Sequence, residues 1–253
     1  MSRLQKAISR IQRRESPRSI GFGVQAREQP RAMLLGVFAD TGAAAKSALE
    51  VGADLVILKG PSGKSAIDQV KAVAGNDHVV GAWLDQVDDA AGTALAEAGC
   101  DFVVSTIEGT AATAIDVERM GQVLVASTQM EDTTLRALAP LGLDALVVEH
   151  GTGPMSLAAQ IQMVRLASFA STPLIVTATP GTPVAELRVL RDSGTIAVVL
   201  PSGSKADDIK AMSERLRSIP PRKPRREGGE MALVPSVTPA AHTEEVEEPD
   251  EDE

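Results

Sequence analysis

Lys59 is the first residue of this 253-residue chain whose type and position suggest chemistry. It ends the apolar run DLVILK (54–59) and directly precedes the glycine-rich stretch GPSGKS (60–65). A lysine that closes a buried strand can lose its charge through desolvation and then act as a base or as an imine-forming nucleophile. The alternative is a charged lysine paired with Asp85 or Asp40, which lie at the ends of other apolar runs.

Glu149 and His150 end a further apolar run, ALVVEH (145–150), and form the second candidate group. Adjacent strand residues point in opposite directions, so only one of the two side chains can point toward a shared site. Histidine changes charge near neutral pH and can serve as a general acid or base, although a hydrogen-bonded turn histidine is as common. We predict Lys59, Asp85, Glu149 and His150 as the catalytic set. The three histidines and the single cysteine fall at different ends of the predicted elements, so no metal site is expected.

A regular repeat must position these candidates. Glycine recurs just before apolar runs, at Gly52, Gly75, Gly99, Gly121, Gly142 and Gly194. Each of these glycines also ends a helix-like stretch, so the repeating unit is a helix, a glycine C-cap and a buried strand. Eight apolar runs are present, at 33–39, 54–59, 79–85, 101–106, 122–128, 145–150, 173–179 and 195–200, and each is followed by a segment of helical character.

The near-continuous apolar character of these runs predicts burial on both faces, which is typical of parallel sheets. Eight β/α units of this kind close naturally into a (βα)8 TIM barrel. An open doubly wound sheet is the alternative, but eight nearly equal units without a topological break favour closure. We therefore predict an α/β protein with a TIM barrel over residues 33–218. The candidates at the strand ends would lie on its carboxyl face, where active sites are built in this fold.

Residues 1–32 are predicted to pack on the barrel as a helix followed by an extended segment. Leu4, Ile8 and Ile11 form an apolar stripe at helical spacing, and basic residues occupy the rest of this amphipathic helix. Without aromatic residues such a helix is a poor membrane anchor. We expect it to cap the underside of the barrel or to contact a second subunit.

Residues 219–253 differ in composition from the rest of the chain. This segment holds four Lys or Arg and ten Asp or Glu, basic first and then acidic, and carries most of the net charge of −9. Segments with few apolar residues and blocks of like charge cannot offset the entropy of ordering, so we predict a disordered tail. The tail either keeps the protein soluble or binds a protein partner.

Composition also limits the partners and the location. Four phenylalanines, one tryptophan and no tyrosine give few stacking platforms for single-stranded nucleic acid, so nucleic acid is not expected as a partner. No apolar run approaches the roughly 18 to 20 residues that a membrane span needs. The amino terminus lacks the apolar core of a secretory signal, and one cysteine cannot build a disulfide framework. We expect a cytoplasmic protein.

The stretch GPSGKS matches only half of a P-loop, because the first glycine of the full motif would fall at Leu58. In a barrel it joins the second strand to its helix, and PSGSK (201–205) repeats it after the eighth strand. Free N–H groups at a helix start, together with a lysine, can hold an anion. The alternative, helix capping by Ser65 with Asp68 and by Ser204 with Asp207, explains the serines and aspartates alone.

The loop after the seventh strand, TATPGTP (177–183), supplies a third helix start, with Thr182 as the expected cap and Pro183 at the first helical position. Phosphate usually binds at the loops after strands 7 and 8 of such barrels. The residues predicted to bind a phosphate or a cofactor are Gly181, Thr182, Ser202, Gly203, Ser204 and Lys205, together with Ser62, Gly63 and Lys64.

Residues 142–203 resemble the phosphate-binding TIM barrels, a group that includes the ribulose-phosphate enzymes and the FMN-dependent oxidoreductases. The resemblance is closest to nitronate monooxygenase-like flavoproteins, on the segments GLDALVVEHGTG, TPLIVTATPGTP and DSGTIAVVLPSG. It implies a catalytic role for His150 in a glycine-rich turn and a role for Gly203 in holding the phosphate of FMN. The seventh strand departs from the family, because TATPG stands where a glycine pair is expected, so the flavin-phosphate motif is eroded.

Two functions are consistent with these features. The first is a TIM-barrel enzyme, of the lyase, isomerase or flavin-dependent oxidoreductase type, that binds a phosphorylated small molecule or a phosphate-bearing cofactor such as FMN at its carboxyl face. The second is a barrel without catalysis, acting as a binding or scaffold subunit through its charged amino-terminal helix and tail, as a homo-oligomer or with a protein partner.

Overall fold

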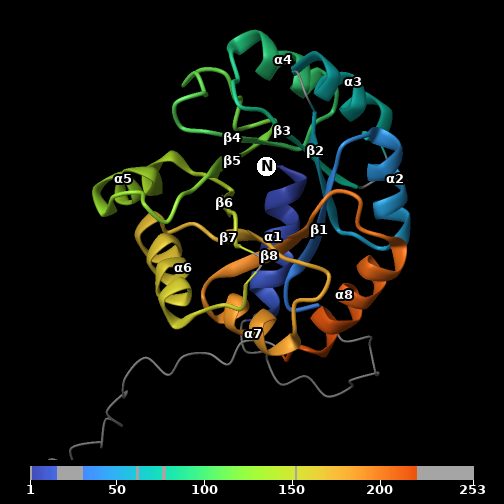
Figure 1. Cartoon of the computed structure of the whole chain (residues 1–253). Helices are drawn as coiled ribbons and strands as arrows, with labels where there is room; N and C mark the ends of the chain where they lie inside the picture. The colour runs from blue at the N-terminus through green and yellow to red at the C-terminus, as the bar shows by residue number, and fades with distance from the viewer. Residues whose placement is uncertain (1, 16–30, 61–62, 76–77, 152, 221–253) are drawn as a thin grey trace, which may run out of the picture. The chain divides into compact units, whose positions relative to one another are not determined.

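Eight parallel strands close into a barrel in the computed structural model of the protein (Figure 1). The structure describes residues 2–15, 31–60, 63–75, 78–151 and 153–220. The strands are β1 (Leu34–Ala39), β2 (Leu55–Lys59), β3 (Val79–Trp83), β4 (Phe102–Ser105), β5 (Gly121–Val125), β6 (Ala145–Val148), β7 (Leu174–Thr177) and β8 (Thr195–Leu200). Each strand pairs with its neighbours in sequence, and β1 pairs with β8. The predicted TIM barrel is confirmed.

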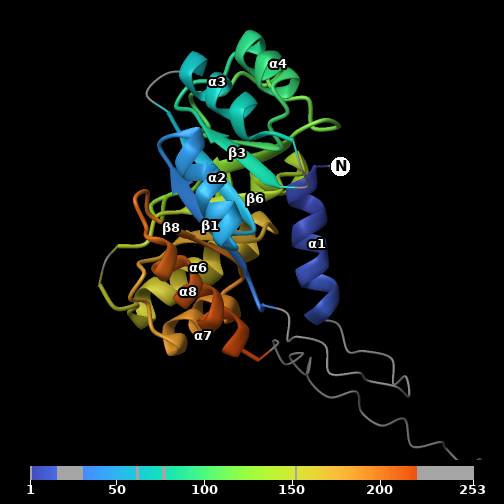
Figure 2. The same cartoon turned by 90° about the vertical axis from the view of Figure 1, so that its right-hand side faces the viewer.

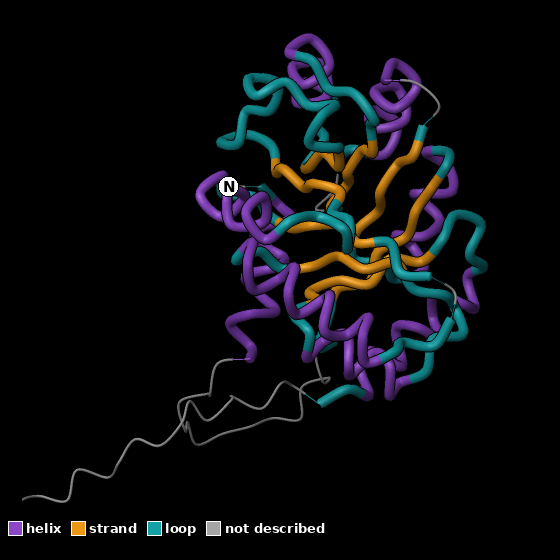
Figure 3. Tube along the Cα trace, turned by 60° about the vertical axis from the view of Figure 1, so that its left-hand side comes forward, coloured by secondary structure: helices purple, strands orange, loops and turns teal. Residues whose placement is uncertain are grey.

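Helices surround the strands on the outside of the barrel (Figure 3). They are α2 (Gly42–Val51), α3 (Gly63–Val73), α4 (Asp89–Glu97), α5 (Asp132–Leu138), α6 (Leu157–Ala170), α7 (Val184–Asp192) and α8 (Ala206–Ser218), with a short 3-10 helix, η1 (Ala139–Leu141), and an amino-terminal helix, α1 (Arg3–Glu15). No helix in the described part of the chain is long and apolar enough to cross a bilayer. Most of the predicted extended segment, at 16–30, lies outside the described residues, as does the predicted tail (219–253) from residue 221 onward.

The prediction of a helix after every strand was wrong between β4 and β5. Residues 106–120 form turns there, joined to the preceding loop by a bridge between Val87 and Thr110. The Thr106 hydroxyl accepts a hydrogen bond from the Gly109 amide at 3.1 Å, and the Thr110 hydroxyl donates to the Thr106 carbonyl at 2.6 Å. Side-chain bonds of this kind to nearby backbone groups compete with helix formation.

Alternate strand residues fill the inside of the barrel. In β2, Leu55 and Ile57 belong to the interior cluster, whereas Val56 and Leu58 pack outward with the cluster that includes helix residues. Phe102 at the start of β4 is a large interior side chain and is completely buried. A Cβ atom at Gly81, on the neighbouring β3, would stand 2.2 Å from the Phe102 ring. Gly81 therefore leaves the space that the Phe102 ring occupies.

Helix α1 lies across the end of the barrel where the strands begin (Figure 2). Its side chains Leu4, Ile8 and Ile11 are 0%, 4% and 5% exposed and join the interior cluster. The Ser2 hydroxyl accepts a bond from the Gln5 amide at 3.0 Å, which caps the helix. Helix α1 thus closes the end opposite to the predicted site.

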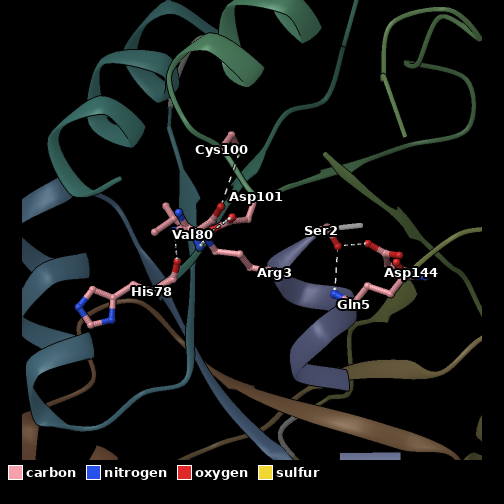
Figure 4. A network of polar contacts seen from close by, with 8 residues as sticks. All are labelled: Ser2, Arg3, Gln5, His78, Val80, Cys100, Asp101 and Asp144. Carbon is pink, nitrogen blue, oxygen red and sulfur yellow. Dashed lines mark hydrogen bonds and ion pairs between the residues drawn. The ribbon is translucent and has the colours of Figure 1, made fainter. Parts of the chain in front are cut away.

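Polar contacts fix α1 to the strand starts (Figure 4). The Ser2 hydroxyl donates to Asp144 at 2.7 Å. The Arg3 guanidinium lies 3.5 Å from Asp101 and donates to the His78 carbonyl at 3.2 Å. Asp101 also accepts from the Val80 amide at 2.8 Å. Asp101 therefore contacts both β3 and α1, and Asp144 holds the residue that precedes α1.

Burial changes the titration of groups at this end of the barrel. Desolvation raises the pKa of Asp101 and Asp144 above the usual value, although the Val80 amide, Arg3 and the Ser2 hydroxyl oppose the shift. Cys100 is also buried here, and desolvation raises the pKa of its thiol to about 12. A protonated, inaccessible thiol at this end cannot serve the carboxyl face as a nucleophile.

We predict that Gly81→Ala destabilises the barrel by about 1–3 kcal/mol, because the new methyl group overlaps the Phe102 ring. Phe102→Leu should relieve part of this cost, so the double variant should be more stable than the sum of the single effects. Urea unfolding of the four proteins measures the coupling. Additive effects would show that Gly81 does not make room for Phe102.

A second prediction concerns Asp101→Asn, which keeps an oxygen acceptor for the Val80 amide but removes the buried charge. Because the folded-state pKa of Asp101 is raised, the stability that its titration contributes is present at low pH and is lost as the pH rises through that pKa. The stability of the wild type relative to Asp101→Asn should therefore fall as the pH rises from the usual aspartate pKa through the raised pKa of Asp101. Unfolding free energies across that range test this, and a difference that grows with pH contradicts it.

Candidate binding site at the carboxyl end of the barrel

Lys59 points into the mouth of the barrel from the end of β2. It shares a strand face with Leu55 and Ile57, which belong to the interior cluster. Its ammonium nitrogen lies 4.4 Å from the centre of the Trp83 ring and 5.9 Å from that of Phe38. Among the described residues, Lys59 forms no ion pair with Asp85 or Asp40, so the alternative of a structural pair is not seen.

Lys59 lies over an aromatic pair at the mouth of the barrel. Trp83 and Phe38 themselves meet edge to face, with ring centres 5.8 Å apart. An ammonium group over an aromatic face is attracted by the negative face of the ring. The Lys59 side chain is also exposed, so it can reach a ligand. The geometry supports a role in holding an anion more than a role as an imine-forming nucleophile.

Glu149 and His150 leave β6 on the opposite wall of the barrel, since four strand steps in a ring of eight separate β6 from β2. Glu149 shares the face of the interior residue Val147 and is exposed at the mouth. The backbone of His150 is held by Thr177 of β7, whose hydroxyl accepts from the His150 amide at 2.8 Å and donates to the His150 carbonyl at 3.2 Å. Glu149 is therefore exposed at the end of β6, whereas His150 is partly buried.

The His150 side chain turns toward α7. Its Nε2 atom is buried and lies 3.5 Å from the Glu186 carboxylate, without a hydrogen bond of good geometry in the described part of the chain. Both side chains are 14% exposed. A separation of 3.5 Å is long for a hydrogen bond, but a small movement of either side chain would complete one. Glu186 is then placed to orient the imidazole ring.

A cavity of about 280 Å³ lies beside this pair, at the loops that follow β6 and β7. We call it the His150 pocket. Its lining residues are His150, Gly151, Gly153, Pro154, Thr179, Gly181, Thr182, Pro183 and Glu186. The pocket thus joins the predicted catalytic histidine to two of the predicted phosphate-binding residues.

Three glycines of the His150 pocket have no structural reason to be glycine. A Cβ atom built at Gly151, Gly153 or Gly181 would meet nothing within 4 Å, and none of the three has a positive φ angle. A glycine costs conformational entropy, roughly 0.4 to 1 kcal/mol relative to alanine where alanine fits. Glycines that neither the turn nor the packing requires are consistent with close approach of a ligand to the backbone.

The start of α7 borders the pocket without a side-chain cap. Pro183 occupies the N-cap position and makes no capping hydrogen bond, because a proline has no side-chain acceptor. The Thr182 hydroxyl accepts from the Thr179 amide at 3.1 Å instead, so the prediction of Thr182 as the cap was wrong. The first N–H groups of α7 are therefore left for water or a ligand.

The other predicted phosphate residues that the structure describes, Ser202, Gly203, Ser204, Lys205, Gly63 and Lys64, do not line this pocket. In the loop after β8, Ser204 donates to the Pro201 carbonyl at 2.7 Å, and the helix cap is Lys205, whose amide donates to Asp208 at 3.1 Å. The predicted cap by Ser204 with Asp207 was one residue early. Gly203 has a φ of 77°, so its turn alone requires glycine.

The loop after β2 leads to a different surface. Helix α3 begins at Gly63, so Ser65 lies inside the helix and accepts from Gln69 at 3.2 Å, and its predicted role as the cap was wrong. Lys64 lines an open groove between α2 and α3 together with Asp68. Ser62 lies outside the described residues. Both glycine-lysine loops do flank the end of β1, because β2 and β8 pair with it.

The barrel is similar to several solved structures, although no protein family and no curated protein matches the sequence. Tryptophan synthase from M. tuberculosis, in its aminoacrylate- and BRD0059-bound form, aligns with a TM-score of 0.63 and 14% identity over 85% of this chain and 97% of that chain. A structure from Aquifex aeolicus VF5 gives 0.62 and 9%, over 85% and 99%. KGPDC from Streptococcus mutans gives 0.60 and 13%, over 73% and 97%.

At these identities the likeness shows a shared fold, the TIM barrel, and leaves function to be argued from the site. The similar structures give no support to the resemblance to nitronate monooxygenase-like flavoproteins.

Sequence reasoning missed Glu186, Trp83 and Phe38 as parts of the site. A glutamate in the first turn of a helix has an ordinary explanation in the helix dipole, and nothing in the sequence indicates its contact with His150. The two aromatic residues looked like core residues. The available signal was that Phe38, Lys59 and Trp83 lie at or near the ends of three successive strands.

We predict that Lys59→Met lowers the free energy of unfolding by no more than about 1 kcal/mol, because methionine keeps the apolar stem and an exposed cation–π contact is worth about 0.5 to 1 kcal/mol. Urea unfolding followed by circular dichroism measures the change. A loss above about 2 kcal/mol would mean that Lys59 is held in place for stability.

Proposed function

We propose that the protein is a TIM-barrel enzyme that binds a small phosphorylated molecule at the carboxyl end of the barrel, with the phosphate in the His150 pocket. One observation supports this proposal above all. Three glycines that neither the turn nor the packing requires line the same pocket as the start of α7, which has no side-chain cap. Backbone amides that a glycine leaves accessible, together with the positive end of a helix, are suited to phosphate oxygens. Tryptophan synthase, one of the similar barrels, is an enzyme, which is consistent with catalysis on this fold.

Glu186 is the feature that opposes this assignment, because its carboxylate lies in the pocket and in the first turn of α7. A phosphate dianion and an isolated carboxylate repel each other. The His150 imidazole lies 3.5 Å from this carboxylate and can donate a hydrogen bond to it, which leaves the backbone amides of the pocket to the phosphate.

The remaining groups of the mouth supply the reacting set. Lys59, whose ammonium nitrogen lies 4.4 Å from the centre of the Trp83 ring, can attract a second anionic group or the charge that develops in a reaction. Glu149 is exposed at the end of β6, on the opposite wall of the barrel, and can transfer a proton. Asp85 follows β3 on the Lys59 side and is exposed. The arrangement fits proton transfer on a phosphorylated substrate that spans the mouth, and FMN is one phosphate-bearing ligand to test.

Trp83 provides the measurement, because it is the only tryptophan and the chain has no tyrosine. Inorganic phosphate, ribose 5-phosphate and FMN are titrated while Trp83 emission and thermal melts are recorded. A ligand that binds the folded state adds about 2.7 kcal/mol of stability at 100 times its dissociation constant. We expect saturable stabilisation by at least one of the phosphorylated compounds.

Three variants locate the site. Gly181→Val should weaken binding at least about tenfold by filling the cavity, and Glu186→Gln should strengthen it severalfold by removing the repelling charge. Lys205→Gln is the matched control, since Lys205 lies outside the His150 pocket. Loss of binding in Lys205→Gln with no effect of Gly181→Val would move the phosphate to the loop after β8 and overturn the proposal.

A further inference from the structure

The exposed face of α1 carries a row of positive charges that takes no part in the proposed phosphate site. Lys6, Arg10 and Arg13 are exposed, and with Arg3 they follow the spacing i, i+3, i+7, i+10. At about 100° per residue these four side chains fall within roughly 80° of arc, on one side of the helix. We call this row the α1 basic stripe.

The direction of the stripe is fixed by the anchoring of α1. Leu4, Ile8 and Ile11 are buried against the barrel interior, and Ser2 and Arg3 are bound at the strand starts (Figure 4). The basic side chains leave the opposite side of the helix. The stripe therefore faces outward from the barrel.

The charges of the stripe are poorly compensated. Of its members, Arg3 contacts Asp101, and the ion pairs of the described residues include none to Lys6, Arg10 or Arg13. Like charges three or four residues apart on a helix destabilise it by about 0.2 to 0.5 kcal/mol per pair. The first turn also lacks an acidic residue that would favour the positive helix end. A bound anionic partner would relieve each of these repulsions.

We propose that the α1 basic stripe is a docking surface for an acidic peptide segment of a protein partner. The stripe is about 15 Å long, from a rise of 1.5 Å per residue, and matches some five residues of an extended chain or three turns of an acidic helix. Successive carboxylates of such a segment would each contact one cation of the stripe. The partner is thus recognised by the spacing of its negative charges.

Two other anionic partners fit less well. A membrane surface usually gains from insertion of apolar side chains, and the apolar face of α1 is already buried in the barrel. A nucleic acid duplex would extend well past the stripe of about 15 Å, and its phosphates beyond that length would contact no cation of the stripe. A short acidic segment matches the stripe in length.

The test uses the full chain and a fluorescein-labelled decapeptide of glutamate, with binding followed by fluorescence anisotropy. We expect binding at about 20 mM salt that weakens severalfold at about 200 mM. The variant Lys6→Gln/Arg10→Gln/Arg13→Gln should lose at least about tenfold in affinity. The reversed variant, Lys6→Glu/Arg10→Glu/Arg13→Glu, should prefer a lysine decapeptide.

The matched control is Lys46→Gln/Lys71→Gln/Lys210→Gln, which removes three exposed charges from α2, α3 and α8 and keeps the stripe. Circular dichroism and thermal melts establish that all variants fold. Equal loss in the control would show that net charge alone drives binding and would overturn the proposal. Tighter binding of a 15-base-pair duplex, or of vesicles with anionic lipid, than of the peptide would also overturn it.

Discussion

Closure of the sheet is the constraint on which the rest of the structure depends. Because β1 pairs with β8, every strand has two neighbours, and alternate side chains must point into one enclosed interior. That interior is filled by residues such as Phe102, for which Gly81 leaves room. The same alternation carries Lys59 and Glu149 to the mouth on opposite walls.

The two ends of the barrel have separate tasks. The end where the strands begin is closed by α1, by Asp101, which accepts from the Val80 amide, and by Asp144, which accepts from the Ser2 hydroxyl. The carboxyl end is open and holds the charged and aromatic side chains. TIM barrels generally divide stability and ligand chemistry between these two ends. The proposed phosphate pocket and the proposed docking surface on α1 lie at opposite ends of the barrel.

The fold was predictable because burial in a closed parallel sheet leaves a strong signal, eight apolar runs with glycine before most of them. The helix expected after β4 failed because Thr106 and Thr110 bond to nearby backbone, which no apolar pattern reveals. Helix starts were misplaced by a residue or more at α3, α7 and α8 for a related reason, since serine and threonine hydroxyls found other partners there. The contact between His150 and Glu186 joins residues far apart in sequence, so only the packed structure brings it out.

The most direct test of the phosphate assignment is a nitrogen–proton correlation spectrum recorded while a phosphorylated ligand, ribose 5-phosphate first, is added. The amides of Gly151, Gly153, Gly181 and Val184 report on the His150 pocket and the start of α7. We expect the chemical shifts of these four amides to change and saturate at ligand concentrations that leave the amide shifts of Gly203 and Lys205 unchanged. Shifts confined to Gly203 and Lys205, or spread evenly over the surface, would contradict it.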